Sequence, residues 1–265
     1  QAPKANMKND VDSLSYMMGV ANTQGLDMYL QQQGVDSTYM AEFLKGVTDG
    51  ANKTSPKDVA YMVGLQVGQQ VGGRMFDMMS QRLFGNDSTQ SLDKANFLAG
   101  FVATLKKQNV MPVEEANMFV QTKAEAIQAK ATEAKYADNK AAGEKFLAEN
   151  AKKEGVKTTP SGLQYKVIKE GKGAIPTDSS TVKVNYKGTL IDGTQFDSSY
   201  DRKEPYTTRA NQVIKGWTEA STMMPVGSKW ELYIPQELAY GLHGTGQIKP
   251  FSALIFEVEL IDIEK

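Results

Sequence analysis

The residue types that carry most enzyme chemistry are scarce in this chain of 265 residues. It has no cysteine and a single histidine, His243, so thiol nucleophiles, disulfides, cysteine-ligated metals and sites with several histidines are excluded. His243 lies in the glycine-rich stretch GLHGTG and is expected to be a solvated loop residue. Neither a G-x-S-x-G elbow nor a G-x-x-x-x-G-K-[ST] loop occurs. Any chemistry must therefore need neither a strong nucleophile nor a metal.

The remaining candidates are aromatic side chains and one aspartate in the C-terminal part of the chain. Trp217 ends the stretch QVIKGW and is one of two tryptophans; it either fills a core or forms the floor of a pocket. Tyr186 and Phe256 lie in alternating patterns, which alone favour core positions. Asp197, in FDSS, fits an aspartate that caps its own turn, and with Arg202 it fits an exposed ion pair worth less than about 1 kcal/mol. The residues alone leave these alternatives open.

The elements that must position these candidates are strands. Apolar residues alternate with polar ones in four stretches, at 163–167, 182–186, 230–234 and 254–260, which is typical of half-buried antiparallel strands. Glycine-rich or proline-rich turns separate them. One short helical stretch begins near Gly216. Residues 155–265 are therefore predicted to form an antiparallel sheet whose apolar face is covered by a short helix.

Residues 1–111 differ in composition and carry a weak internal repeat. They contain 10 of the 13 methionines and no tryptophan, and methionine suits either an irregular core, the favoured interpretation, or an adaptable binding surface. YMMGV (16–20) is echoed by YMVGL (61–65), and FLKGV (43–47) by FLAGF (97–101). The longer second copy places its extra residues around 85–91. Each copy is predicted to be helix, turn, helix, so this region is an all-α domain with a duplicated unit.

Glycine spacing adds one expectation to the second copy. Gly64, Gly68 and Gly72 recur every four residues, so they lie on one helix face, where the absent side chains favour close approach of another helix.

Residues 112–154 are rich in Ala, Lys, Glu and Gln and sparse in large apolar residues. This composition predicts one long exposed helix of roughly 60 Å that connects the two domains. Gly155 is the expected C-terminal stop and Gly143 the site of a modest kink.

The charge balance narrows the class of partner. The chain has 30 basic and 31 acidic residues, and neither end carries the basic excess expected of a nucleic-acid binder. No apolar run is long enough for a membrane span. The chain begins at Gln1 without a signal peptide or initiator methionine, so a mature or trimmed product is expected.

Several motifs together resemble one family. VNYKGTL (184–190), DGTQFDSS (192–199), QVIKGW (212–217), MPVGSKW (224–230), LAYG (238–241) and LIFEVEL (254–260) occur in the order and spacing of the FK506-binding proteins. Residues 146–168 are similar to the join in the macrophage infectivity potentiator (Mip) branch. The resemblance implies an α+β protein with a helical dimerisation-type domain (1–111), a long connecting helix (112–154) and an isomerase domain (155–265). The last is implied to be a sheet of five or six strands around a short helix.

The resemblance also implies which residues form the site. Those with catalytic roles would be Tyr186, Phe196, Asp197, Ile214, Tyr240 and Phe256, and those that bind substrate would be Arg202, Tyr206, Val213, Trp217 and Ile248. The reaction implied is cis-trans isomerisation of Xaa-Pro bonds, which needs no proton transfer from the substrate. The resemblance also implies a flap over the pocket, QIKPF (247–251). It departs from the family, because Lys249 stands where a proline is usual; a loosened or re-aimed flap and a cation near the pocket mouth are expected.

Three functions are compatible with these features of the sequence: an active prolyl isomerase, a holdase chaperone that uses the helical domain, and a proline-peptide binding module with little turnover. The resemblance favours the isomerase, with unfolded or folding proline-containing polypeptides as partners and FK506-like or rapamycin-like macrolides as inhibitors. It also implies a homodimer or a single-chain pseudo-dimer, the bacterial periplasm or outer membrane as location, and neither cofactor nor metal.

Overall fold

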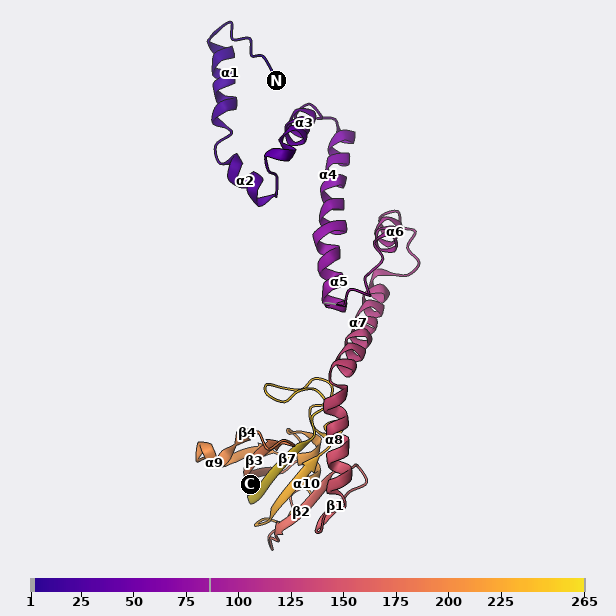
Figure 1. Ribbon diagram of the computed structural model, residues 1–265, viewed down its shortest axis with the longest axis vertical. Coiled ribbons are helices and arrows are strands. Elements are labelled where there is room, and N and C mark those ends of the chain that lie inside the picture. Colours follow the sequence, from indigo (N-terminus) through magenta and orange to yellow (C-terminus); the bar gives the residue numbers. More distant parts are fainter. Residues whose placement is uncertain (1–2, 86, 265) are drawn as a thin grey trace. The chain divides into compact units, whose positions relative to one another are not determined.

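The computed structural model describes residues 3–85 and 87–264 (Figure 1). It separates into two compact units. One holds the residues up to 80 together with 92–98, and the other holds 81–91 together with the residues from 99 onwards.

The described residues of the second unit contain a seven-stranded antiparallel sheet. Its order is β1-β2-β6-β7-β3-β4, and β5 pairs with β3 at 181–184, beside the 187–189 segment that pairs with β4. The bounds are β1 (Val156–Thr158), β2 (Gln164–Lys169), β3 (Thr181–Leu190), β4 (Gln195–Ser198), β5 (Tyr206–Arg209), β6 (Lys229–Ile234) and β7 (Leu254–Glu264). The sheet has one strand more than the upper number expected, because three residues of β1 fold back onto β2.

Helix α10 (Lys215–Ser221) covers the apolar face of this sheet, as the alternation predicted. Trp217 and Ala220 of α10 pack on buried strand residues such as Val184 and Leu232. The close approach requires Gly216, since a Cβ there would lie 2.6 Å from Cγ2 of Ile234. Two shorter helices, α9 (Ser199–Arg202) and η3 (Gln236–Leu238), follow β4 and β6.

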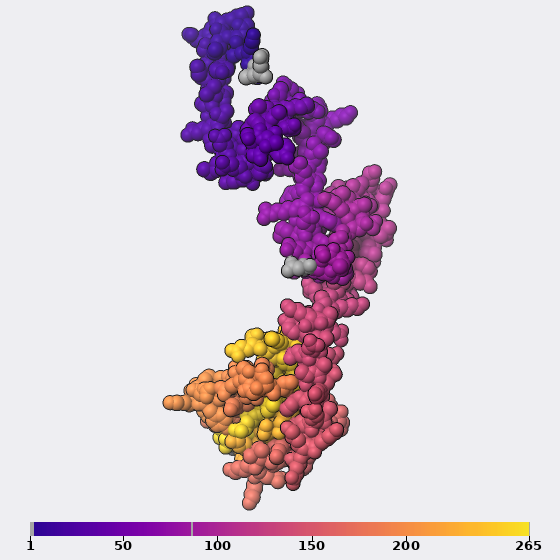
Figure 2. All heavy atoms as spheres, viewed as in Figure 1, coloured from indigo at the N-terminus to yellow at the C-terminus, as the bar shows by residue number. Residues whose placement is uncertain are grey.

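The expected continuous connecting helix is two helices. Helix α7 (Val113–Lys135) buries no residue, and α8 (Ala137–Asn150) follows a break at Tyr136, whose backbone has φ −112° and ψ 19°. Helix α8 ends at Asn150, before the expected stop at Gly155. Gly143 does not mark a kink: it lies where α8 packs closely on the sheet unit, since a Cβ there would lie 3.2 Å from Cβ of Ala253. The atoms of α8 lie against those of the sheet in Figure 2, and Asn139 and Asn150 of α8 donate hydrogen bonds to Pro250 and Gln164.

The N-terminal helices are α1 (Asp10–Ala21), α2 (Leu26–Gln32), η1 (Ser37–Tyr39), α3 (Met40–Ala51), α4 (Pro56–Gln70), η2 (Val71–Met75), α5 (Phe76–Phe84) and α6 (Lys94–Leu105). The echoed segments fall on α1 and α4, and on α3 and α6. Each copy has more helices than the expected helix-turn-helix pair. Residues 85–91 lie between α5 and α6.

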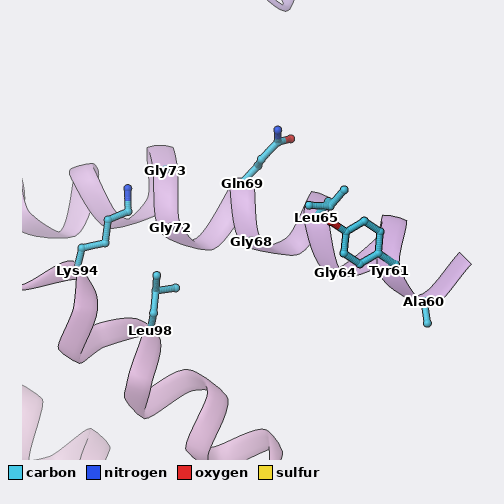
Figure 3. A pocket seen from close by; sticks show the side chains of 10 residues that line it. All are labelled: Ala60, Tyr61, Gly64, Leu65, Gly68, Gln69, Gly72, Gly73, Lys94 and Leu98. Carbon is cyan, nitrogen blue, oxygen red and sulfur yellow. The ribbon is translucent and has the colours of Figure 1, made fainter. Parts of the chain in front are cut away.

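The expectation of a methionine-rich core in residues 1–111 is wrong for the single chain. Among the described residues of these helices, only Leu30 and Phe76 are buried large hydrophobic residues, and Met17 is 59% exposed. The expected helix approach along the glycines is also limited. Gly72 faces Lys94 and Leu98 of α6 (Figure 3), whereas no described atom outside the local helix backbone lies within 4 Å of a Cβ built at Gly64 or Gly68.

Candidate active site

A cavity of about 1030 Å³ opens between the sheet and α10. All eleven site residues that the resemblance implies line it. They come from β3 (Tyr186), β4 (Phe196, Asp197), α9 (Arg202), β5 (Tyr206), the turn before α10 (Val213, Ile214), α10 itself (Trp217), the loop between β6 and β7 (Tyr240, Ile248) and β7 (Phe256).

Aromatic rings form the floor and walls of the cavity. The ring of Trp217 meets Tyr186 edge-on, with centroids 5.0 Å apart, and Phe256 edge-on at 5.2 Å. Phe196 meets Phe256 edge-on at 5.5 Å, and Tyr206 meets Tyr186 at 5.9 Å. Trp217 is only 5% exposed yet lines the cavity. It is therefore both a core residue and a pocket residue, which resolves the alternative that the residues alone left open.

Asp197 is held by three donors at one side of the cavity. The Tyr186 hydroxyl donates to Oδ2, Arg202 donates to Oδ1, and the backbone N–H of Ser198 donates to Oδ1 at 2.8 Å. Arg202 also donates to the Tyr186 hydroxyl at 2.9 Å and lies over the Tyr186 ring. Asp197 is thus one corner of a network within the pocket, not an isolated surface ion pair.

This network sets the protonation of its members. Burial favours the protonated carboxyl of Asp197, but the hydrogen bonds from Tyr186 and Arg202 outweigh it and hold the pKa of Asp197 below its usual range. Burial, followed by the hydrogen bond to Asp197, raises the pKa of Tyr186 to about 12. At neutral pH the carboxylate is therefore ionised and the phenol is protonated.

Two hydrogen-bond donors at the cavity have no acceptor among the described residues. Ile214 is the N-cap of α10, with φ −56° and ψ 148°, so its N–H lies outside the helical pattern. The hydroxyl of Tyr240 likewise makes no hydrogen bond within 3–85 and 87–264. Burial and the negative charge of Asp197 raise the pKa of Tyr240, so the hydroxyl stays protonated. Both groups suit a substrate carbonyl.

Four further residues line the cavity that were not assigned a role: Gln212, Thr245, Gly246 and Gln247. Gln212 begins the QVIKGW motif, and the other three precede Ile248, so adjacency to the motifs was the signal that could have found them. Lys249 is exposed and does not line the cavity. His243 is exposed, as expected.

An antiparallel sheet and the short helix α10 enclose an aromatic pocket that offers hydrogen-bond donors but no free base. Residues 172–261 match the family model of FKBP-type peptidyl-prolyl cis-trans isomerases, and 56–167 match that of the domain amino-terminal to them. The chain is 46% identical over 215 residues to the FKBP-type 22 kDa peptidyl-prolyl cis-trans isomerase of Escherichia coli K12, which covers 79% of this chain and 96% of that protein.

Two other relatives extend this likeness. The outer membrane protein MIP of Legionella longbeachae is 37% identical over 82% of this chain and 90% of its own length. The crystal structure of FkpA from Escherichia coli matches with a TM-score of 0.50 and 37% identity, covering 80% of this chain and 98% of that one.

The chain therefore belongs to the FKBP-type peptidyl-prolyl cis-trans isomerases. As a member of that family it acts on Xaa-Pro bonds, and its substrates are proline-containing polypeptides. None of the helices described here combines the length and the apolar character that crossing a membrane requires.

Proposed function

We propose that the cavity accelerates Xaa-Pro isomerisation without covalent chemistry, by favouring the twisted amide over the planar one. The uncatalysed step takes roughly 10–100 s at 25 °C, with an activation energy of about 20 kcal/mol. The twisted amide has less charge separation than the planar amide, so an apolar aromatic box penalises the planar ground state. The observation that carries this proposal is the ring cluster of Trp217, Tyr186 and Phe256 at the cavity floor.

Each polar group then has a role that needs no proton transfer. The proline ring stacks on Trp217, with Phe196, Tyr206, Val213 and Ile248 as walls. The N–H of Ile214 and the hydroxyl of Tyr240 donate to substrate carbonyls, contacts that raise a rate when they are stronger in the twisted state. Asp197 acts through its field, because its low pKa and three donors leave it a poor base.

Replacing Tyr240 by Phe tests this assignment. Tyr200 supplies the matched control, since both tyrosines are 38% exposed but only Tyr240 lines the cavity. With one hydrogen bond lost, Tyr240→Phe is expected to lower kcat/KM on a short Xaa-Pro peptide about fivefold to tenfold, and Tyr200→Phe to leave it unchanged. Phe196→Ala is expected to lower it further. Parent rates in both Tyr240→Phe and Phe196→Ala would remove the basis for the pocket roles.

We also propose a chaperone activity, because apolar side chains are exposed along the helices. On α7, Met118 is 69% exposed and Phe119 is 54% exposed, and methionine-rich surfaces adapt to varied partners. The full chain is expected to suppress aggregation of a heat-denatured client, and the Phe196→Ala variant to suppress it equally well. Met118→Ser with Phe119→Ser is expected to weaken suppression. No suppression by the parent would rule this function out.

A homodimer is our proposal for the N-terminal helices. Val11 is 70% exposed, Met17 59% and Val63 52%, and a second copy would bury such faces. The alternative is a monomeric pseudo-dimer, in which the two repeat copies pair within one chain. Light scattering at several concentrations separates them: a dimer has twice the chain mass of 29.1 kDa, whereas a constant 29.1 kDa favours the pseudo-dimer.

The remaining expectations are also proposals. Macrolides of the FK506 and rapamycin type suit the size and apolar walls of the cavity and are expected to inhibit competitively with peptide. The bacterial periplasm or outer membrane is the proposed location, supported by the name of the Legionella relative. Fractionation of cells that express the native gene tests it.

A further inference from the structure

Helix α8 contacts the loop that places Ile248 in the cavity. Ile248 is 5% exposed, and Thr245 pairs with it through backbone hydrogen bonds of 2.8 and 2.7 Å. The chain then runs through residues 249–253 before entering β7. This short segment is the part of the loop that α8 contacts.

One amide of α8 holds the segment. Nδ2 of Asn139 donates to the carbonyl of Pro250 at 2.8 Å and to Oγ of Ser252 at 2.9 Å. Oγ of Ser252 in turn donates to the carbonyl of Lys249 at 2.8 Å. Asn139 therefore controls, directly and through Ser252, the carbonyls of the two residues that follow Ile248.

The backbone held in this way is strained. Phe251 has φ 61°, a left-handed conformation that is uncommon for a bulky residue and that persists only where the surrounding contacts enforce it. Its ring is 8% exposed, with Nζ of Lys140 at 5.5 Å from the ring centre, and its N–H donates to Gly241 at 2.8 Å. The contacts with α8 are thus part of what enforces the path of the loop.

The far end of α8 is anchored independently. Nδ2 of Asn150, a residue 1% exposed, donates to Gln164 at 2.9 Å, and Gln164 donates to the carbonyl of Leu147 at 2.8 Å. Phe146 meets Tyr233 with ring centres 6.2 Å apart. These contacts fix α8 to the sheet, so that Asn139 at the start of the helix is presented to the loop from a rigid support.

From this geometry we infer that Asn139 is a positioning residue for the isomerase pocket: it sets the path of the loop through the carbonyls of Lys249 and Pro250 and thereby the placement of Ile248. The inference rests on the proposed role of Ile248 as a wall of the pocket. Asn139 itself does not line the cavity. Its effect on turnover would pass through the loop.

Two substitutions separate positioning from a merely structural role. Asn139→Ala removes the amide. Asn139→Asp keeps its shape but cannot donate to either oxygen, and a carboxylate in the first turn of a helix normally stabilises that helix. Asn117, exposed on α7, supplies the control substitution Asn117→Ala. The readouts on the full chain are kcat/KM for a short Xaa-Pro peptide and the methyl NMR signal of labelled Ile248.

Both Asn139 variants are expected to lower kcat/KM about fivefold to tenfold and to move the Ile248 signal, while Asn117→Ala changes neither. Parent-like kcat/KM and an unmoved methyl signal in Asn139→Asp would overturn the inference, whatever Asn139→Ala does. The methyl signal reports the loop whether or not the protein turns over. A parent without turnover would therefore count against the proposed function, and an unmoved signal against the role of Asn139.

Discussion

Gly188 of β3 lies between two aromatic walls of the cavity. A Cβ at this position would lie 2.6 Å from Cζ of Phe196 and 2.7 Å from Cε1 of Phe256. Carbon atoms in contact are about 3.5–4.0 Å apart, so a methyl group must displace each ring by about 1 Å. Phe256 is buried on a central strand, whereas Phe196 is only partly buried. Gly188→Ala is therefore expected to push mainly Phe196.

Gly188→Ala is expected to lower catalytic activity more than it lowers stability. Overpacking by one methyl group costs about 1–3 kcal/mol of unfolding free energy, while a displacement of about 1 Å at a catalytic site lowers rates by up to about 100-fold. Urea denaturation and kcat/KM on a short Xaa-Pro peptide measure the two effects. We expect kcat/KM to fall about 10- to 100-fold in folded Gly188→Ala.

Gly193 provides the matched control in the neighbouring turn. It has φ +89° and no atom within 4 Å of a built Cβ, so Gly193→Ala costs about 1–2 kcal/mol of backbone strain without touching a ring. Its kcat/KM should remain near that of the parent. The reasoning is refuted if Gly188→Ala keeps parent activity, or if Gly193→Ala loses as much.

Four further outcomes are expected. Because the folded pKa of Asp197 lies below the ordinary value of 3.8, its contribution to stability is present above that value and is lost as the pH falls through the folded pKa. The unfolding free energies of the parent and Asp197→Asn, measured by urea denaturation, should therefore become equal at acid pH. The pKa of Tyr186 is raised from 10.0 to about 12, so its contribution is present below pH 10 and lost as the pH rises towards 12; in Tyr186→Phe the alkaline loss measured by urea denaturation should shrink. Gly143→Leu forces a side chain against Ala253 and should lower the unfolding free energy by about 1–3 kcal/mol in the same assay. His243→Ala should leave kcat/KM within about twofold, since His243 is exposed and lies off the cavity.

The sheet domain was predictable because its information is local. Alternation in stretches such as 182–186 and 254–260 assigns each side chain to one face of a strand, and pairing of β3 with β7 then brings Tyr186 and Phe256 to the same face. The short helix that begins near Gly216 was also predicted from the sequence. What the residues alone could not settle was whether Trp217 filled a core or lined a pocket, because both positions require the same apolar side chain.

The helical part was predicted less well, since burial there depends on surfaces outside the local sequence. The methionine content suggested a core, but the single chain leaves residues such as Met17 exposed. The connecting segment has a composition that favours one helix throughout. It nevertheless breaks at Tyr136, and only the second of the two helices, α8, is held by the sheet at Asn150.

By itself the sequence predicted the family, four of the seven strands of the sheet and, through the family resemblance, eleven of the residues that line the cavity, because these depend on periodicity and on motifs close together along the chain. The tertiary structure alone decided three other features: that Asp197 is saturated by donors from β3, β4 and α9, that α8 packs on the sheet, and that Asn139 reaches the loop at Pro250. The donors to Asp197 lie near it in sequence, and only the folded backbone turns their side chains towards one carboxylate. For the contacts of α8 and Asn139 the physical reason is distance along the chain. Asn139 and Pro250 are 111 residues apart, and no local propensity specifies a contact between residues so widely separated in sequence.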